Sequence, residues 1–136
     1  KQKQISSLIK LCHKLIRQYK IKKKNIIGHS DIAPLRKIDP GEKFPWKYLA
    51  KKKVGIWYDH EPNFLKRHRR IKISTKKDKK KFIENLNKIG YCVSTKNKSS
   101  FIKTVKAYQR HFRKELINGI LDQECFIIAQ NLIKKL

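Results

Sequence analysis

The stretch IIGHSDIAPLRKIDPGEKFPW, residues 26–46, holds unusually varied chemistry for this chain and suggests how the surrounding residues fold. It contains one His, two Asp, one Arg, two Gly and three Pro, in a sequence that is otherwise rich in Lys and Ile. Residues 25–29 predict a short buried strand ending in a glycine and a histidine. Residues 30–45 predict a loop, because proline and glycine prevent a long regular element there. We therefore expect functional residues just past the end of a strand.

An amphipathic helix is predicted before this strand. Apolar side chains recur at helical spacing over residues 5–19, and a lysine-rich turn follows them. A helix, a tight turn and a strand together make an α/β unit, which places functional residues at the strand end. After the loop, residues 44–50 predict a short helix with Trp46 buried, and residues 54–58 predict an edge strand or an extended segment.

A second structural unit is predicted in the C-terminal part. Residues 59–75 predict a strongly basic linker. Three short helices follow: the first stops at Gly90, the second is capped by Ser99 or Ser100, and the third is capped by Asp122. Three short helices in about 60 residues predict a small bundle with its own core, here residues 76–136.

The composition limits the possible classes of protein. The 136 residues suffice for one ordinary domain or two very small ones. No apolar run approaches the length of a membrane span, so no transmembrane segment is predicted. Three widely spaced cysteines without a CxxC pattern predict no disulfide framework.

The net charge of +26 has two interpretations. It is typical of proteins with an anionic partner such as nucleic acid, anionic lipid or a cell-wall polymer. It also arises from AT-rich codons, with Lys filling solvated positions. The 29 Lys against 7 Arg favour the second interpretation, because Arg supplies the bidentate donor that phosphate and base recognition use. No helix-turn-helix, zinc-finger or aromatic-basic signature predicts specific nucleic-acid binding.

His29 and Asp39 are candidate ligands of a divalent metal ion. A His at a strand end and a carboxylate in the following loop can converge on one ion, and a catalytic zinc takes three protein ligands. Lys37 lies two residues before Asp39, so in an extended stretch its ammonium faces the same way and could stabilise an oxyanion. The spacing alone leaves open a structural or incidental origin for the pair.

The full string GHSDIAPLRKIDPGEKFPW, residues 28–46, resembles the zinc-dependent N-acetylmuramoyl-L-alanine amidases of the type that includes peptidoglycan recognition proteins. In that family a GHSDIAPGRKxDPGxxFPW-like segment closes the active site. The resemblance implies that His29 and Asp39 are zinc ligands and that Lys37 stabilises the tetrahedral intermediate. Leu35 departs from the pattern, because the family usually has glycine there. The positions that match the scaffold of the loop are Gly28, Pro34, Arg36, Pro40, Gly41, Phe44 and Trp46.

The C-terminal part carries a second resemblance. The stretch VKAYQRHFRKELINGILDQECFIIAQNLI, residues 105–133, is similar to the three-helix peptidoglycan-binding domain that follows the amidase domain in some family members. The two resemblances imply an α/β fold: residues 1–58 as the C-terminal part of a mixed-sheet amidase domain, residues 59–75 as linker, and residues 76–136 as a peptidoglycan-binding bundle.

Two functional groups of the family have no counterpart here: its first zinc-binding His and its catalytic Glu. Two ligands alone would hold zinc weakly, and the general base would be lacking. We therefore expect a separate or preceding N-terminal half of the amidase to supply them, or else a remnant without activity. The remaining histidines, His13, His60, His68 and His111, are interpreted as structural.

The leading hypothesis is a zinc-dependent amidase that cleaves the bond between N-acetylmuramic acid and L-alanine in peptidoglycan, with peptidoglycan or muropeptides as partners. The alternative is a peptidoglycan-binding module without catalysis. Both hypotheses favour the bacterial cell envelope, meaning the periplasm, over the cytoplasm.

Overall fold

The structure is a computed structural model of the chain, and it describes residues 2–73, 75–93 and 97–136. Lys1 in the first predicted domain, Ser74 in the predicted linker and residues 94–96 in the predicted bundle lie outside the described residues.

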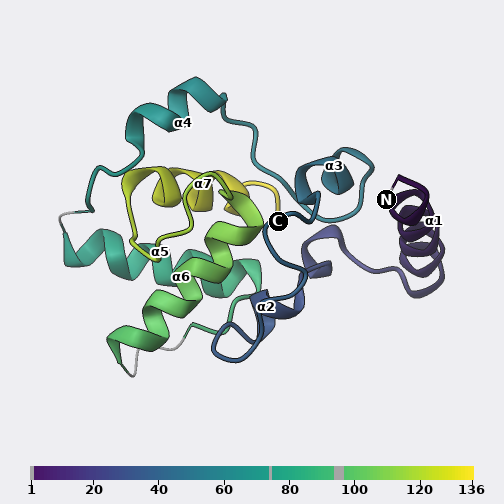
Figure 1. Cartoon of the computed structure of the whole chain (residues 1–136), viewed down its shortest axis with the longest axis horizontal. Coiled ribbons are helices and arrows are strands. Elements are labelled where there is room, and N and C mark those ends of the chain that lie inside the picture. The colour runs from purple at the N-terminus through teal and green to yellow at the C-terminus, as the bar shows by residue number, and fades with distance from the viewer. Residues whose placement is uncertain (1, 74, 94–96) are drawn as a thin grey trace.

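The described residues form helices joined by turns and extended segments (Figure 1). In chain order the helices are α1 (Gln2–Tyr19), the 3-10 helix η1 (Lys23–Asn25), α2 (His29–Ile32), α3 (Trp46–Lys51), α4 (Pro62–His68), α5 (Lys76–Ile89), α6 (Lys98–Phe112) and α7 (Gln123–Ile133). Within these described parts of the chain there is no β-strand, and only an isolated antiparallel bridge joins Lys72 to Asp122. The predicted α/β fold with a mixed sheet is therefore wrong, because this part of the protein is all-helical.

The strand predicted over residues 25–29 is absent for a physical reason. Ile26 (φ −98°, ψ 99°) and Gly28 (φ −84°, ψ 163°) do have extended backbones, but α2 begins immediately afterwards at His29. A strand also needs a neighbour with which to form ladder hydrogen bonds. No other extended segment among the described residues pairs with this one. The local preference for an extended backbone is met, while the sheet is not formed.

The helices α4, α5, α6 and α7 pack around the larger of two apolar clusters (Figure 1). The long helices α5 and α7 lie against each other, and α4 packs on α7. We call these four helices the helical bundle. Its fully buried apolar side chains are Phe82, Leu86, Val105, Ala107, Tyr108, Cys125, Ile128, Ala129 and Leu132. The three C-terminal helices were predicted, whereas α4 lies inside the stretch predicted as a linker and contributes the buried Leu65.

The helix ends of the bundle follow local chemistry. Gly90 ends α5 in the left-handed region (φ 113°), as predicted, because glycine has no Cβ to clash there. Asp122 caps α7 by accepting the Cys125 backbone N–H at 3.0 Å, also as predicted. The predicted serine cap of α6 is wrong. Asn97 caps this helix, and its side chain accepts the Ser100 backbone N–H at 2.8 Å.

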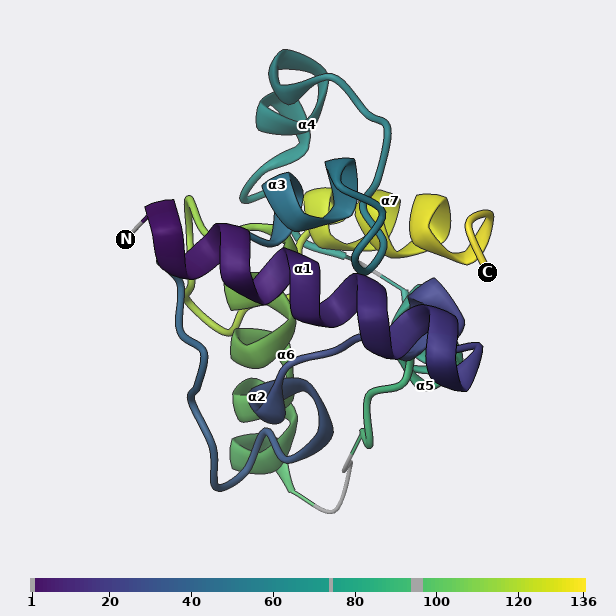
Figure 2. The same cartoon turned by 90° about the vertical axis from the view of Figure 1, so that its right-hand side faces the viewer.

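A smaller apolar cluster joins α1 to α3. Trp46, Leu49 and Val54 are its buried members, and the partly buried face of α1 packs against them. Helix α1 lies at one end of the molecule, beyond α3 (Figures 1 and 2). It buries no residue completely, and its Leu11 is 53% exposed although the helix is strongly amphipathic. Trp57 packs against both clusters. The division into domains at residues 58 and 76 stays a prediction.

A buried group of charged side chains connects the end of α4 to the start of α7. Arg69 forms a bidentate pair with Glu124, with Nε donating to Oε2 at 2.7 Å and Nη2 donating to Oε1 at 2.9 Å. Arg113 is fully buried and its Nη1 donates to both Asp122 (2.9 Å) and Glu124 (3.1 Å). These contacts order the segment that follows α4, which the sequence alone indicated only as basic.

Candidate functional site

The quoted stretch forms a compact loop that begins at Gly28 and closes on itself. Ser30 N–H donates to the Asp39 carbonyl at 2.9 Å, Ala33 N–H donates to the His29 carbonyl at 2.9 Å, and Gly41 N–H donates to the Ile38 carbonyl at 3.1 Å. The Ser30 bond brings the two ends of the loop together, and the other two bonds fix a local turn at each end.

Glycine is needed at position 28 because other groups approach it closely. A Cβ there would lie 2.9 Å from Pro40 Cδ, 3.1 Å from Trp46 Cζ2 and 3.2 Å from Asp31 Oδ2. The backbone of Gly28 itself is extended and unstrained. Glycine is therefore needed because there is no room for a Cβ, and the absence of a side chain lets the start of α2 pack beneath Trp46.

His29 and Asp39 are brought together at the mouth of this loop. His29 Nδ1 lies 3.1 Å from Asp39 Oδ2, and the side chains are 49% and 61% exposed. We call these two residues the ligand pair. An exposed pair of this kind contributes little to stability. Its donors, an imidazole nitrogen and a carboxylate oxygen, are both ligands that zinc accepts, so the pair fits a zinc ion on its chemistry.

Lys37 lies in the same loop and is half-buried. Its backbone N–H donates to the Ala33 carbonyl at 3.0 Å, which fixes the chain two residues before Asp39. Its role as the group that stabilises an oxyanion stays a prediction. Leu35, where the family pattern has glycine, is not among the described non-glycine residues with positive φ, which are Lys20, Lys53 and Arg70. The loop therefore accommodates a Cβ at this position.

The ligand pair alone does not complete a metal site. No group of three or more His, Cys, Asp or Glu side chains is placed to hold a metal ion within the described ranges. Other histidines have local partners: His13 Nε2 lies 2.7 Å from the Lys52 carbonyl, and His68 Nδ1 lies 2.9 Å from the Phe64 carbonyl. His60 lies against the Phe64 ring, with ring centroids 5.3 Å apart.

Asp31 is a residue whose importance sequence reasoning missed. Its carboxylate is almost fully buried, accepts the Gly28 backbone N–H at 2.7 Å and accepts the Tyr91 hydroxyl at 2.7 Å. Its Oδ2 also lies 2.6 Å from His111 Nδ1. A local signal did exist, because an acidic residue three positions after a helix N-cap can bond back to the cap. The partners 60 and 80 residues away carried no such signal.

His111 occupies a slot between two aromatic rings. Its ring stacks on Trp46 with centroids 3.9 Å apart and on Phe112 with centroids 4.0 Å apart.

Burial, reinforced by the negative charge of Asp31 and the hydrogen bond to it, raises the pKa of Tyr91 well above its ordinary value. Tyr91 therefore stays a neutral hydroxyl donor over any physiological pH.

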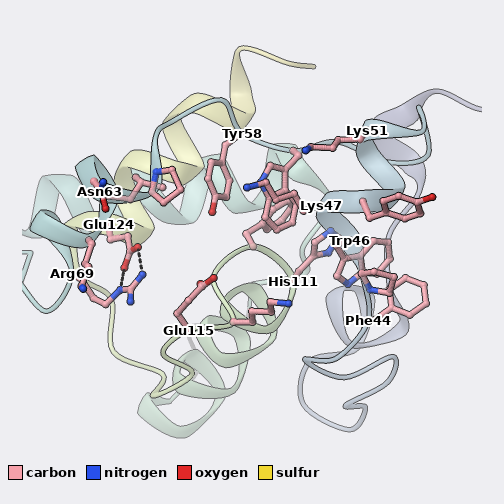
Figure 3. A pocket seen from close by; sticks show the side chains of 18 residues that line it. Phe44, Trp46, Lys47, Lys51, Tyr58, Asn63, Arg69, His111, Glu115 and Glu124 are labelled. Atoms are coloured by element: carbon pink, nitrogen blue, oxygen red, sulfur yellow. Dashed lines mark hydrogen bonds and ion pairs between the residues drawn. The ribbon is translucent and has the colours of Figure 1, made fainter. Parts of the chain in front are cut away.

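A cavity of about 570 Å³ lies beside Trp46, between α3 and α4 (Figure 3). Phe44 and Trp46 line one end and the Arg69–Glu124 pair lines the other, with the Tyr58 ring between them. The cavity is lined by none of the predicted site residues. Burial, with the charges of Glu115 and Glu124 nearby, raises the pKa of Tyr58 to about 12. Besides Arg69, the cavity is lined by four cationic side chains, those of Lys47, Lys51, Lys66 and Lys114.

Comparison with known proteins agrees with the loop and the bundle. Residues 1–42 match the sequence model of the family described as N-acetylmuramoyl-L-alanine amidase, and this range includes the ligand pair and Lys37. The chain is thus homologous to the N-acetylmuramoyl-L-alanine amidases, which confirms the resemblance seen in the sequence.

Particular relatives extend the match along the chain. The N-acetylmuramoyl-L-alanine amidase AmiD of Escherichia coli is 39% identical over 134 residues, which are 97% of this chain and 48% of AmiD. The 1,6-anhydro-N-acetylmuramyl-L-alanine amidase AmpD of Haemophilus influenzae is 49% identical over 49 residues, 35% of this chain and 27% of AmpD.

Solved structures agree with the fold. The complex of Escherichia coli AmiD with the substrate anhydro-N-acetylmuramic acid-L-Ala-D-gamma-Glu-L-Lys superposes with a TM-score of 0.82 at 38% identity, covering 97% of this chain and 51% of that one. AmpDh3 of Pseudomonas aeruginosa in complex with anhydromuramic pentapeptide gives a TM-score of 0.82 at 33% identity, covering 99% of this chain and 53% of that one. The chain therefore spans about half the length of these relatives. No helix among its described residues has the length and hydropathy needed to cross a bilayer.

Proposed function

We propose that this chain forms part of a zinc-dependent amidase that hydrolyses the bond between N-acetylmuramic acid and L-alanine in peptidoglycan. The observation that carries the proposal is the approach of His29 Nδ1 to Asp39 Oδ2 at 3.1 Å, inside the segment that matches the amidase family. A histidine and a carboxylate that meet at an exposed loop mouth can bind one ion and present it to a polymer substrate.

Each residue of the loop has a role in this proposal. The ligand pair would hold the zinc ion, which when bound polarises a water molecule and the substrate carbonyl. The Lys37 ammonium would stabilise the negative charge that develops on the carbonyl oxygen. The short backbone bonds of the loop would keep the pair in place without further reorganisation.

A third ligand and a general base are still required. Since the described residues hold no group of three ligands, we propose that the first zinc His and the catalytic Glu come from an N-terminal half of the amidase, on the same or on a separate polypeptide. The half-exposed apolar side chains on α1, Leu11 and Leu15, offer a surface on which such a half could pack. Such an enzyme would act in the bacterial cell envelope, where peptidoglycan lies, and we favour the periplasm over the cytoplasm.

Fusion of the N-terminal half of Escherichia coli AmiD ahead of this chain tests the proposal. The fusion should bind about one zinc ion per molecule, by elemental analysis, and release L-alanine-linked peptide from muropeptides. The same fusion carrying both His29→Ala and Asp39→Ala is the matched control and should do neither. An inactive, metal-free fusion that is correctly folded would count against the proposal. Full activity of residues 1–136 alone would show that another residue, such as His13 or His60, supplies the missing ligand.

The cavity beside Trp46 supports a second candidate function, peptidoglycan binding without catalysis. Aromatic faces can stack on sugar rings, and the lysines around them can pair with the carboxylates of stem peptides. Sedimentation with purified peptidoglycan tests this function. Lys66→Gln with Lys114→Gln in the cavity should weaken retention at moderate salt more than Lys80→Gln with Lys134→Gln outside it, because diffuse surface charge is screened. Equal losses in the two double variants would show that retention depends on the overall positive charge and not on the cavity.

A further inference from the structure

The Asp31 carboxylate lies where the loop that carries the ligand pair meets the helical bundle. Its Oδ2 accepts the Gly28 backbone N–H and lies 2.6 Å from His111 Nδ1, while its Oδ1 accepts the Tyr91 hydroxyl. We propose that Tyr91 and His111 are positioning residues that hold the ligand pair in place through Asp31. Their effect on zinc binding and catalysis rests on the proposed function, whereas their effect on the geometry of the pair does not.

The loop side of this connection determines where α2 begins. The bond from Gly28 N–H to Asp31 Oδ2, at 2.7 Å, closes the first turn, so the helix starts at His29. Ser30 N–H, one residue further, donates to the Asp39 carbonyl at 2.9 Å. A displacement of Asp31 would therefore move both members of the ligand pair, one through the turn and the other through the Ser30 bond.

The bundle side is held by packing. Tyr91 is 3% exposed and directly follows the end of α5, inside the larger apolar cluster. His111 lies in α6 and is enclosed between the Trp46 and Phe112 rings. Because packed interiors deform little, neither side chain can follow Asp31 if the loop moves. The two residues therefore act as fixed points.

Asp31 depends on these two partners. Its side chain is only 1% exposed, and a carboxylate buried to that extent needs donors or an opposite charge close by. Tyr91 donates its hydroxyl, and the 2.6 Å contact requires that His111 Nδ1 carries a proton directed at Oδ2. Without these two partners only the Gly28 N–H would remain to the carboxylate, which would then turn toward water and pull the first turn of α2 with it.

The competing explanation is that Tyr91 and His111 only stabilise the fold. Tyr108 provides a matched control. It is a buried tyrosine of the same apolar cluster, and its hydroxyl donates to the Cys125 carbonyl at 3.1 Å, wholly inside the bundle. Tyr91→Phe and Tyr108→Phe remove the same atom from the same core, but only the first removes a bond to the loop.

The experiment uses the full chain without metal and measures two properties of the loop by NMR. These are the ring nitrogen resonances of His29 and the hydrogen-exchange rate of the Ser30 amide. Tyr91→Phe should shift the His29 resonances and speed Ser30 exchange by about tenfold, the factor that corresponds to one lost hydrogen bond. His111→Phe, which keeps a stacked ring but loses the donor, should do the same, and His111→Gln, which restores an N–H donor, should partly reverse it.

The control determines the interpretation. Tyr108→Phe should leave the His29 resonances and Ser30 exchange unchanged, even where its loss of thermal stability equals that of Tyr91→Phe. Unchanged resonances and exchange in both Tyr91→Phe and His111→Phe would overturn the proposal. Titration of each variant with Zn²⁺ alone, followed through the same His29 resonances, tests the effect on metal binding. Tyr91→Phe and His111→Phe should bind Zn²⁺ more weakly than Tyr108→Phe. Because two ligands alone would hold zinc weakly, this titration is carried out in the fusion with the N-terminal half of AmiD, where failure to bind Zn²⁺ would count against the proposed function and leave the metal-free result standing.

Discussion

His111 Nδ1 lies 2.6 Å from Asp31 Oδ2, although 80 residues separate the two in the sequence. This contact joins the C-terminal turn of α6 to the loop that holds the ligand pair. The helical bundle thus touches the candidate site directly. We expect variants of the loop and of the bundle to be coupled, because residues in one hydrogen-bond network rarely act additively.

Asp39→Ala and Lys37→Ala should have different effects in the reconstituted amidase described above. Asp39→Ala deletes a ligand, so metal content and turnover should fall together. Lys37→Ala should keep the metal and lower turnover by roughly two to three orders of magnitude, the usual loss for one group that stabilises an oxyanion. Elemental analysis and release of peptide from muropeptides measure the two effects. Loss of zinc in Lys37→Ala would assign that lysine a different role.

Gly28→Ala should destabilise the chain because the new Cβ would approach Pro40 and Trp46 to about 3 Å. We expect a loss of roughly 1–3 kcal/mol in the free energy of unfolding, the usual cost of forcing extra atoms into a packed region. Urea unfolding followed by circular dichroism measures it. Ala33→Ser, in the same loop, is the comparison and should cost less. A Gly28→Ala chain as stable as the wild type would mean that the loop relaxes away from Trp46 easily.

Local features could be predicted from the sequence. The apolar spacing of residues 5–19 predicts α1, and Gly90 and Asp122 carry the end signals that α5 and α7 use. His29 and Asp39 were singled out because a family pattern names them, and the structure brings their side chains together, while their role as metal ligands stays a prediction. These predictions depend on residues within a few turns of one another, where backbone sterics and capping determine the outcome.

Features that depend on distant partners were missed. The extended residues 26–28 indicate a strand, but a strand also requires a neighbour that the sequence does not reveal. Helix α4 was hidden by its basic composition, because the single buried Leu65 gives no periodic signal. The Asp31 network joins residues 60 and 80 positions apart, so no short window contains both the carboxylate and its donors.

Arg113→Ala should be among the most destabilising substitutions. Arg113 is fully buried and pairs with Asp122 and Glu124, which would both lose a charge partner in the interior. Breaking a buried pair by removing one member costs about 3–5 kcal/mol. Lys81→Ala, which breaks the exposed Lys81–Glu84 pair, is the control and should cost less than about 1 kcal/mol. Similar losses in the two variants, measured by urea unfolding, would contradict a central role for the buried group.

Cys125 should be protected from thiol reagents in the folded chain. Burial raises the pKa of its thiol to about 12, so little thiolate exists near neutral pH and the reagent cannot reach it. Cys92 is exposed and should react first. With an aromatic disulfide reagent at pH 8 we expect a fast phase from Cys92, lost in Cys92→Ser, a slower reaction of the partly buried Cys12, and access to Cys125 only after unfolding in urea. Rapid reaction of Cys125 in the native chain would show that α7 opens readily.

Tyr58 should make the folded chain less stable as the pH rises above about 10. Burial raises the pKa of Tyr58 from 10.0 to about 12 in the folded state, while in the unfolded chain it ionises near the ordinary value. The raised pKa means that the unfolded state loses a proton first. Stability from the neutral hydroxyl is complete below pH 10 and is lost as the pH rises from about 10 through 12.

Tyr58→Phe isolates this effect, because the substitution removes the ionisable group and keeps the ring in the cavity. The free energy of unfolding, measured by urea at pH 8 and pH 11, should fall less for Tyr58→Phe than for the wild type. Tyr19→Phe, at a side chain that is 64% exposed, is the matched control and should follow the wild type. A Tyr58→Phe chain that loses as much stability as the wild type would mean that the hydroxyl is already solvated in the folded state.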